Sequence, residues 1–439
     1  MQKAQVYVFD NNQEKLLEFL KNNTFVKGLT YQTEYQIKQF NLIVVSPGVN
    51  PNNNIVSIAK YCEVPLVSDI ELLYLFKKNF LIGITGSNGK TTTCTLLNEI
   101  LKEKYKVDLC GNIGKPAIEN WSQQHDALIV ETSSFQLEYL DKLRYNISVI
   151  LNLHENHLDW HFNFEEYCTA KTNIFKNSKK SDYLILNADD KNIKKLNIYK
   201  TKAKVLWFST KKECKGIYIE KNNIILNINK KEVICNLNNI NLIGEHNLQN
   251  ILVSVLVAKL LNINNKVIEK TIKSFKAPEH RLEKFYSFYN VDCFNDSKST
   301  TIQSTLSAIK ALKNYNIILL LGGSSKNLNF DMLSKNLPQN VKQILVFGET
   351  QNEISKSLNK YNVNHIVCSN INNAILSSVT SSLSLDVVND SVYHKNQVKN
   401  KTAILFSPAC ASFDSFNSFE ERGIYFKEYL KSCVEDILK

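Results

Sequence analysis

A buried strand that runs into a glycine–lysine loop is the feature that most constrains this chain. The apolar run 80–84 is followed by T-G-S-N-G-K-T-T at 85–92, and a helical pattern extends from there to about Lys104. Glycines let backbone N–H groups approach phosphate oxygens, and the start of a helix adds a favourable dipole. An ordinary tight turn would not require strand, glycines, lysine and helix together. We therefore predict a loop that binds ATP through Gly86, Ser87, Asn88, Gly89, Lys90, Thr91 and Thr92.

Short apolar runs alternate with helical segments along the whole chain, a pattern typical of α/β proteins with parallel sheets. A length of 439 residues predicts about three domains. We expect a Rossmann-like domain at 1–77, a parallel sheet like that of P-loop ATPases at 78–276, and a second Rossmann-like domain at 277–439. The expected strands are 6–9, 42–45, 80–84, 127–130, 148–151, 183–186, 204–207, 317–321, 344–347, 365–368 and 403–406, with short strands across 216–237 and an amphipathic helix across 244–261.

The composition excludes several classes of protein. A net charge of +11 suits anionic partners such as nucleotides, but lysine is abundant throughout, so nucleic acid is not expected as a partner. The ten cysteines contain no C-x-x-C pair, which disfavours a zinc ribbon or a thioredoxin-like site. No apolar run approaches the ~18 residues of a membrane-spanning helix, and the first residues lack the apolar core of a signal peptide. We expect a cytoplasmic monomer with no membrane partner.

An acidic residue stands where the phosphate loop would need one. The apolar run 127–130 ends at Glu131, and ligands gather at the carboxyl ends of parallel strands. A carboxylate at such a strand end is a natural Mg²⁺ ligand, although helix capping is an alternative role for an acid at that place.

Three motifs in the following segment resemble those of the Mur ligases. Residues 131–138, E-T-S-S-F-Q-L-E, resemble the family's E-L-S-S-F-Q-L-E. Residues 152–161, N-L-H-E-N-H-L-D-W-H, resemble N-x-x-x-D-H-L-D-x-H, with Asn156 in place of the usual Asp. Residues 167–171 match Y-x-x-A-K. The phosphate loop has two residues between Gly86 and Gly89 rather than four, and this spacing resembles the Mur ligases and folylpolyglutamate synthase.

The resemblance implies an ATP-dependent ligase that uses two Mg²⁺ ions. It implies catalytic roles for Lys90, Glu131, His157 and Lys171, and metal binding by Thr91, Glu131, His157 and Lys171. In the family, this last lysine is carbamylated by CO₂. The carbamylation requires a neutral amine, and hence a lysine whose pKa is lowered by desolvation.

Further motifs extend the resemblance into the last third of the chain. Residues 244–250 resemble G-x-H-N-x-x-N, residues 278–283 resemble P-x-H-R-x-E, and residues 295–301 resemble N-D-S-K-A-T-N with Thr301 where Asn is usual. They imply nucleotide binding by Asn247, Asn250, Arg281, Asp296 and Lys298. Asn247 alternatively caps the helix that starts there.

Four motifs point to the branch of the family that adds D-glutamate: S-P-G-V at 46–49, G-N-I-G at 111–114, L-L-G-G-S-S-K at 320–326, and S-P-A-C-A-S-F-D-S-F continuing to F-E-E-R-G across 407–423. The D-N-P-R motif of the branches that add diaminopimelate or lysine is absent. The implied substrates are ATP, D-glutamate and UDP-N-acetylmuramoyl-L-alanine, a peptidoglycan precursor. The implied substrate-binding residues are Asp10, Ser46, Pro47, Gly48, Asn112, Thr300, Lys326, Ser407 and Phe413.

Three alternatives remain open at this point. The family's first strand and glycine-rich turn are expected to be missing here, because the first apolar run resembles the family's second strand and ends at Asp10. An inactive paralogue is therefore one alternative. A ligase similar to folylpolyglutamate synthase is another, although such an enzyme should lack the 407–423 motif. A nucleic-acid-dependent ATPase is the third, but the ordinary Walker spacing that it requires is not present.

Overall fold

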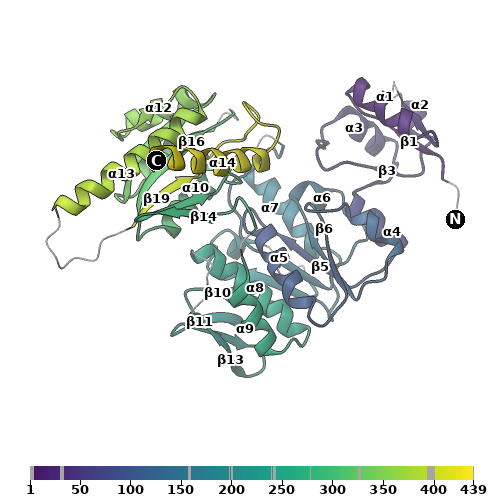
Figure 1. Ribbon diagram of the computed structural model, residues 1–439. Helices are drawn as coiled ribbons and strands as arrows, with labels where there is room; N and C mark the ends of the chain where they lie inside the picture. Colours follow the sequence, from purple (N-terminus) through teal and green to yellow (C-terminus); the bar gives the residue numbers. More distant parts are fainter. Residues whose placement is uncertain are drawn as a thin grey trace.

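The computed structural model describes residues 4–29, 34–156, 160–196, 198, 201–238, 240, 244–276, 278–324, 328–392 and 401–438, with backbone only for 385–392. The protein is a mixed α/β structure, as the sequence predicts. Its elements collect in three groups (Figure 1). The N-terminal group is purple at the upper right, the central group is blue to teal below, and the C-terminal group is green to yellow at the upper left.

The N-terminal group holds two small parallel sheets, β1–β2 and β3–β4, where the sequence predicts one. Its last helix, α4, docks on the central group. The buried carboxylate of Glu71 on α4 accepts the backbone N–H groups of Asp141, Lys142 and Leu143 at 2.9–3.1 Å. The elements of this group are β1 (Val6–Val8), α1 (Gln13–Asn22), β2 (Val26–Gly28), α2 (Glu34–Ile37), β3 (Ile43–Val44), α3 (Asn54–Tyr61), β4 (Leu66–Val67) and α4 (Asp69–Phe76).

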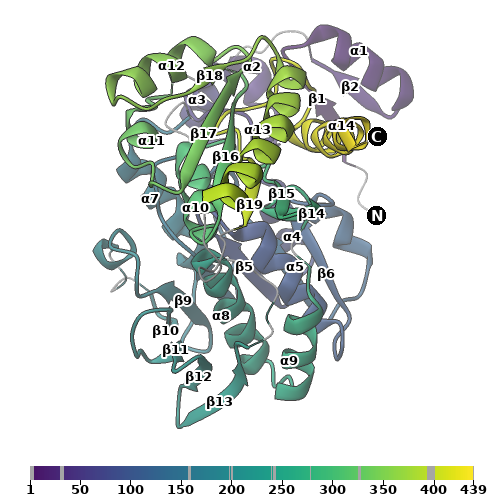
Figure 2. The same ribbon diagram turned by 60° about the vertical axis from the view of Figure 1, so that its left-hand side comes forward.

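The central group is built on a nine-stranded sheet in the order β13-β12-β11-β10-β9-β8-β5-β7-β6, parallel from β6 to β11. One face packs against α5, α8 and α9, and the other against α4, α6 and α7. Figure 2 shows α5, α8 and α9 together on the first of these faces. The elements are β5 (Leu81–Thr85), α5 (Lys90–Leu101), β6 (Val107–Gly111), η1 (Ala117–Ser122), β7 (Ala127–Glu131), α6 (Ser134–Glu138), β8 (Ile147–Ile150), α7 (Phe164–Thr172), η2 (Asn173–Phe175), β9 (Tyr183–Asn187), η3 (Ile193–Lys195), β10 (Lys204–Ser209), β11 (Gly216–Glu220), β12 (Asn223–Asn227), β13 (Lys231–Asn236), α8 (Glu245–Leu260) and α9 (Asn265–Ser274).

The C-terminal group has a six-stranded sheet in the order β14-β15-β19-β16-β17-β18, parallel except for the hairpin β14–β15 at its edge. The sequence patterns above do not predict this hairpin. The elements are β14 (Glu283–Phe288), β15 (Val291–Asn295), α10 (Ile302–Ala311), β16 (Asn316–Gly322), α11 (Asp331–Lys335), β17 (Val341–Phe347), α12 (Gln351–Lys360), β18 (Ile366–Val367), α13 (Ile371–Val392), β19 (Thr402–Phe406) and α14 (Phe419–Leu438).

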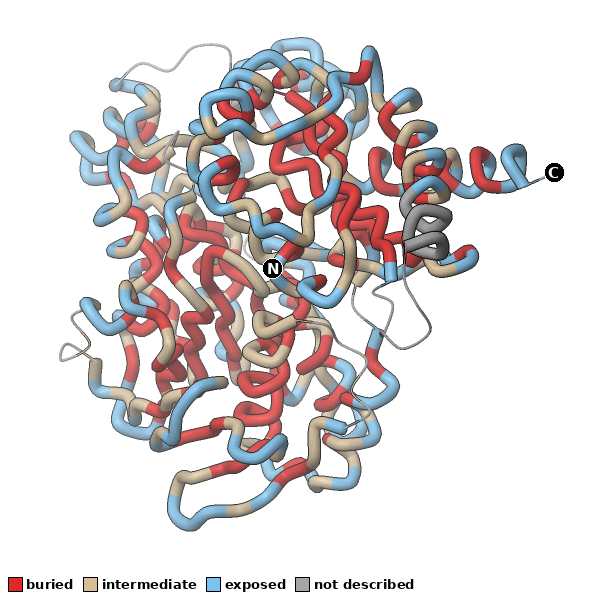
Figure 3. The backbone as a smooth tube through the Cα atoms, turned by 90° about the vertical axis from the view of Figure 1, so that its left-hand side faces the viewer, coloured by how far each residue is buried: buried red, intermediate tan, exposed pale blue. Residues whose placement is uncertain are grey.

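The central strands of the large sheets are buried along their whole length, as in β5, β7, β8 and β19 (Figure 3). Helix α8 corrects one expectation, because it is not amphipathic. Every residue from Asn250 to Ala258 is buried, since the helix packs on the sheet, on α5 and on α9. A helix that is buried on most sides shows no polar face.

Arg422 on α14 fastens the loop that follows β19. It is 1% exposed and donates to the carbonyl oxygens of Ala411 (2.9 Å), Cys410 (3.0 Å) and Ser297 (2.8 Å), and to the Ser297 hydroxyl (3.0 Å). Burial lowers the pKa of Arg422 to about 10. The arginine of the F-E-E-R-G motif thus ties the 407–416 segment to the segment after β15.

We predict that Arg422→Met lowers the free energy of unfolding by about 3 kcal/mol, because it leaves buried acceptors without a donor. Thermal or denaturant unfolding measures the change. Lys431→Met, an exposed position on the same helix, is the matched control and should change stability by less than about 0.5 kcal/mol. Equal stabilities for the two variants would contradict this role of Arg422.

Candidate active site

The predicted phosphate loop lies between β5 and α5. Gly89 precedes the helix with φ +86°, and a Cβ there would lie 2.4 Å from Oδ1 of Asn250, so only glycine fits. The ammonium of Lys90 lies back over the loop and donates to the carbonyl oxygens of Gly86 (2.9 Å) and Ser87 (3.2 Å). Strand, glycines, lysine and helix therefore combine as the sequence predicts.

The segment after β8 holds this loop in shape. The side chain of Asn152 pairs with the backbone of Asn88, accepting its N–H at 2.8 Å and donating to its carbonyl at 3.1 Å. The Ser87 hydroxyl accepts the N–H of His154 at 2.9 Å and lies 2.8 Å from the hydroxyl of Tyr167. Ser87 therefore holds the loop in shape through its side chain, and its backbone N–H adds a hydrogen bond to the carbonyl of Asn152 at 3.0 Å.

Glu131 ends β7, the strand next to β5, and is 3% exposed. Its Oε1 accepts the side-chain amide of Asn112 at 2.9 Å, while Oε2 is buried with no hydrogen-bond partner in the described part of the chain. A buried carboxylate oxygen without a donor is costly unless a cation satisfies it. Glu131 acts electrostatically on Lys90, Lys171, Arg281 and Lys298.

Lys171 on α7 is 2% exposed and points toward the end of β5. Its Nζ donates to the Thr85 hydroxyl at 3.1 Å and lies 4.8 Å from the ring centre of Tyr167. Burial, assisted by the charge of Lys90, holds the pKa of Lys171 well below its ordinary value. Sequence reasoning gave no role to Tyr167 or Thr85. The i, i+4 spacing of Tyr167 and Lys171 on one helix is the signal that predicts their contact.

Arg281 reaches the phosphate loop from the C-terminal group. Its Nη2 donates to the Thr91 hydroxyl at 3.0 Å, and its Nε is buried without a partner among the described residues. Burial lowers the pKa of Arg281. Both neighbours, His280 and Leu282, have positive φ angles (64° and 46°). Such strain at non-glycine residues is typical of functional sites.

The segment after β15 supports that arginine. Asp296 accepts the N–H of Leu282 at 3.0 Å and the hydroxyl of Ser407 at 2.7 Å, and burial raises its pKa to about 6. Burial lowers the pKa of Lys298 to about 8, with a contribution from Arg281, and its ammonium lies 4.7 Å from the ring centre of Phe419. Thr300 follows in the same turn.

Asn247 and Asn250 lie in the first turns of α8, both buried. Asn250 donates to Asn247 at 3.2 Å and accepts the Thr93 hydroxyl at 3.1 Å. The cap of this helix is Gly244, so Asn247 does not cap it.

Asp10, Ser46, Pro47 and Gly48 lie in the N-terminal group, where the backbone turns from Ser46 to Val49. The neighbouring segment contacts the central group. Asn50 donates to the carbonyl of Trp160 at 3.1 Å, and the Tyr139 hydroxyl donates to that of Val49 at 3.2 Å.

The other predicted substrate-binding and metal-binding residues lie as follows. Asn112 lies beside Glu131, the Ser407 hydroxyl is bonded to Asp296, and Phe413 is 71% exposed. His157 and Lys326 lie outside the described residues.

The residues at the strand ends fit a divalent cation. Within the described ranges, no three His, Cys, Asp or Glu side chains gather as a metal site. The orphaned oxygen of Glu131 and the Thr91 hydroxyl are nevertheless oxygen donors of the kind that Mg²⁺ prefers. Lys171 would add oxygen ligands only after carbamylation.

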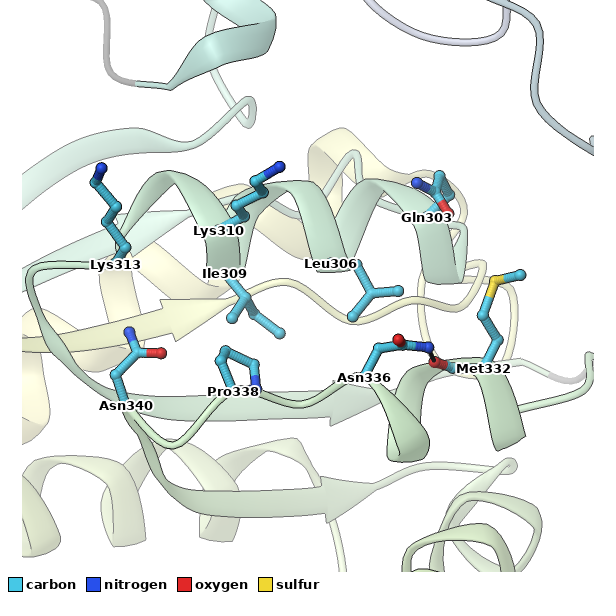
Figure 4. A pocket seen from close by; sticks show the side chains of 9 residues that line it. All are labelled: Gln303, Leu306, Ile309, Lys310, Lys313, Met332, Asn336, Pro338 and Asn340. Carbon is cyan, nitrogen blue, oxygen red and sulfur yellow. Dashed lines mark hydrogen bonds between the residues drawn. The ribbon is translucent and has the colours of Figure 1, made fainter. Parts of the chain in front are cut away.

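A hollow of about 490 Å³ lies elsewhere, between α10 and the segment from Met332 to Asn340 (Figure 4). Leu306 and Ile309 point toward its floor, while the ammonium groups of Lys310 and Lys313 point away from it. None of the predicted site residues lines this hollow. No helix in the described part of the chain is long and apolar enough to cross a bilayer.

Comparison with known proteins agrees with this arrangement. The model of the Mur ligase middle domain matches residues 84–258. A UDP-N-acetylmuramoylalanine–D-glutamate ligase of Clostridioides difficile is 36% identical over 427 residues, covering 95% of this chain and 90% of that protein. The ligase of the same name from Lachnoclostridium phytofermentans is 33% identical, covering 99% of this chain and 94% of that protein.

Solved structures show the same fold. MurF from Acinetobacter baumannii has a TM-score of 0.61 at 14% identity, covering 92% of this chain and 93% of that one. MurF from Thermotoga maritima, solved in complex with ADP, has a TM-score of 0.60 at 15% identity, covering 92% and 97%. By its sequence similarity and its fold, the chain belongs to the Mur ligase family, among the UDP-N-acetylmuramoylalanine–D-glutamate ligases.

Proposed function

We propose that this protein uses ATP to join D-glutamate to UDP-N-acetylmuramoyl-L-alanine in peptidoglycan precursor synthesis. The observation that carries the proposal is the set of cations around Glu131, which combines the phosphate loop with Arg281 from the C-terminal group. The similarity to named D-glutamate ligases over 95% of the chain supports the choice of substrate.

The first step forms an acyl phosphate. A carboxylate oxygen of the alanine attacks the γ-phosphorus of ATP, the bond to the β-phosphate oxygen breaks, and ADP leaves. Lys90 and Arg281 stabilise the charge on the transferring group, because both are cations held where the phosphates would lie. Asn247 and Asn250, which pack against α5, are placed to orient the nucleotide.

The second step forms the amide. The amine of D-glutamate attacks the acyl carbon, inorganic phosphate leaves, and the nitrogen loses a proton. We assign recognition of D-glutamate to Thr300, Lys326 and Phe413, with Ser407 acting through Asp296. Because these residues and the phosphate loop belong to different groups, closure of the groups would exclude water from the acyl phosphate.

Two Mg²⁺ ions and a carbamate on Lys171 belong to the same proposal. The neutral amine of Lys171 adds to CO₂ with loss of one proton, and the resulting carboxylate would join Thr91, Glu131 and His157 in holding the metal. Support comes from the burial and lowered pKa of Lys171 and from the orphaned oxygen of Glu131. Bound Mg²⁺ would neutralise charge on the phosphates.

Each of the three groups is assigned one substrate. We propose that residues 1–77 bind the UDP substrate through Asp10, Ser46, Pro47 and Gly48, that 78–276 bind ATP, and that 277–439 bind the amino acid. A monomer in the cytoplasm, with small-molecule partners and without nucleic acid or membrane, completes this proposal.

We predict that phosphate release requires UDP-N-acetylmuramoyl-L-alanine and D-glutamate together. Lys90→Ala should lower kcat by about 100-fold or more at unchanged melting temperature, because the lysine stabilises charge in the transition state. A coupled phosphate assay measures both. Release with a folate substrate, or ATP hydrolysis without either substrate, would contradict the proposal, and so would a fully active Lys90→Ala variant.

We predict that Lys171→Met melts at a higher temperature than the wild type in CO₂-free buffer at pH 7. The folded pKa of Lys171 lies below its unfolded value of about 10.4. Between these values the unfolded chain binds a proton that the folded chain does not, so the wild type loses stability as pH falls. The difference between variant and wild type should therefore shrink as pH rises toward 10.

Bicarbonate tests the carbamate in the same experiment. It should raise the melting temperature of the wild type and leave that of Lys171→Met unchanged. A stability difference independent of pH would contradict the neutral amine, and equal responses to bicarbonate would contradict the carbamate.

A further inference from the structure

A half-buried carboxylate at the start of α4 joins three segments of the chain. Oδ2 of Asp69 accepts the backbone N–H of Ala117 at 3.1 Å, and Oδ1 accepts Nε2 of Gln136 at 3.1 Å. Asp69 itself follows β4 and Ser68, at the end of the N-terminal group. Both carboxylate oxygens are therefore committed to the central group.

Each partner of Asp69 lies in a short helix that follows a loop beside Glu131: Ala117 begins η1, and Gln136 lies in α6. Ala117 closes the loop 111–116, in which Asn112 donates to Oε1 of Glu131 at 2.9 Å. Gln136 accepts the N–H of Ser133 at 3.1 Å and so shapes the turn that follows Glu131. These loops lie at the ends of β6 and β7, which are neighbours in the sheet.

The phosphate loop lies on the other side of Glu131. It follows β5, and the segment that holds it follows β8, the next strand in the sheet order. Neither hydrogen bond of Asp69 goes to that side. A change at Asp69 should therefore disturb the loop 111–116 and the turn from Thr132 into α6 while leaving the phosphate loop in place.

We propose that Asp69 is a positioning residue for the acceptor substrate. It fixes the loops beside Glu131 relative to the N-terminal group and so aligns the carboxylate of the nucleotide-linked substrate with the phosphoryl donor. The inference rests on the proposed function, in which the N-terminal group binds the UDP portion. It adds a residue outside the motifs that carry the family resemblance.

Glu71 provides a matched control on the same helix. It is fully buried, and its three backbone donors lie in the segment 141–143 before β8, at the opposite end of the sheet from Glu131. Glu71→Gln should lower the melting temperature and leave the kinetic constants unchanged. A merely structural role for Asp69 would give the same pattern.

The test is a double-mutant cycle with D69N and Q136E. In D69N the amide oxygen still accepts the N–H of Ala117, but its NH₂ then faces the NH₂ of Gln136. In Q136E two carboxylates face each other. In the double variant the amide can donate to the carboxylate at 136, which also suits the capping box with Ser133.

We expect D69N to raise KM for UDP-N-acetylmuramoyl-L-alanine about tenfold, because the variant loses one hydrogen bond to a charged group. KM for ATP should change less than about twofold. The double variant should recover the acceptor KM to within about twofold of the wild type. Calorimetry of acceptor binding should rank the variants in the same order.

An unchanged acceptor KM in D69N, equal rises for ATP and acceptor, or a double variant no better than D69N would each overturn the role of Asp69. A wild type that neither turns over nor binds the acceptor would instead overturn the proposed function, and this inference with it. Turnover in the wild type together with an unshifted D69N overturns the inference alone.

Discussion

The buried carboxylate of Glu131 is the group on which the arrangement of the site depends. Three cations interact with it electrostatically, Lys90 of the phosphate loop and Arg281 and Lys298 of the C-terminal group, and the amine of Lys171 on α7 does so as well. Buried like charges repel each other, and the lowered pKa values of Lys90, Lys171 and Lys298 express that repulsion together with burial. Glu131 is shared among these cations, while Asp296 acts on Arg281 and Glu420 on Lys298. A site that gathers these cations is complementary to a polyphosphate.

The fold maintains this unfavourable cluster with rigid, well-bonded supports. Asn152 and Ser87 fix the phosphate loop, and Asp296 fixes the strained turn that carries Arg281. Arg422 fixes the loop after β19, beside the same turn. Asn152 and Arg422 lie outside the predicted binding residues, and their hydrogen bonds hold segments that contain such residues. The cluster therefore lowers the stability of the fold while it holds the site in one arrangement before a substrate binds, as is common in enzymes.

The sequence predicted the elements and motifs better than the connections between them. The phosphate loop, the strand ending at Glu131 and the parallel strands follow from local pattern, because apolar runs and glycines report local geometry. The hairpin β14–β15 was missed because its first strand, Glu283–Phe288, overlaps the end of the 278–283 motif and its aromatic residues do not form a continuous apolar run. Helix α8 seemed amphipathic, but packing on several sides buries it.

Long-range contacts could not be predicted from the sequence, because they depend on how distant segments pack together. Arg281 and Thr91 are 190 residues apart, and nothing local specifies that a guanidinium meets that hydroxyl. The bonds of Asp69 to Ala117 and Gln136 span 48 and 67 residues, and they depend on how α4 docks on the sheet. The resemblance to the Mur ligases singled out Arg281 without showing its contact. It gave no hint of Asp69.

The most direct test of the charge cluster is the melting temperature of the protein with increasing MgATP. Because a ligand that binds only the folded state stabilises it, the temperature should rise with the logarithm of ATP concentration. Adenosine at the same concentrations should produce little shift, since it lacks the phosphates that the cations attract. Arg281→Met removes one of the repelling cations, so it should melt no lower than the wild type without ligand and gain less from ATP. Equal shifts with ATP and adenosine, or no shift at millimolar MgATP, would contradict the assignment of this cluster as the phosphate site.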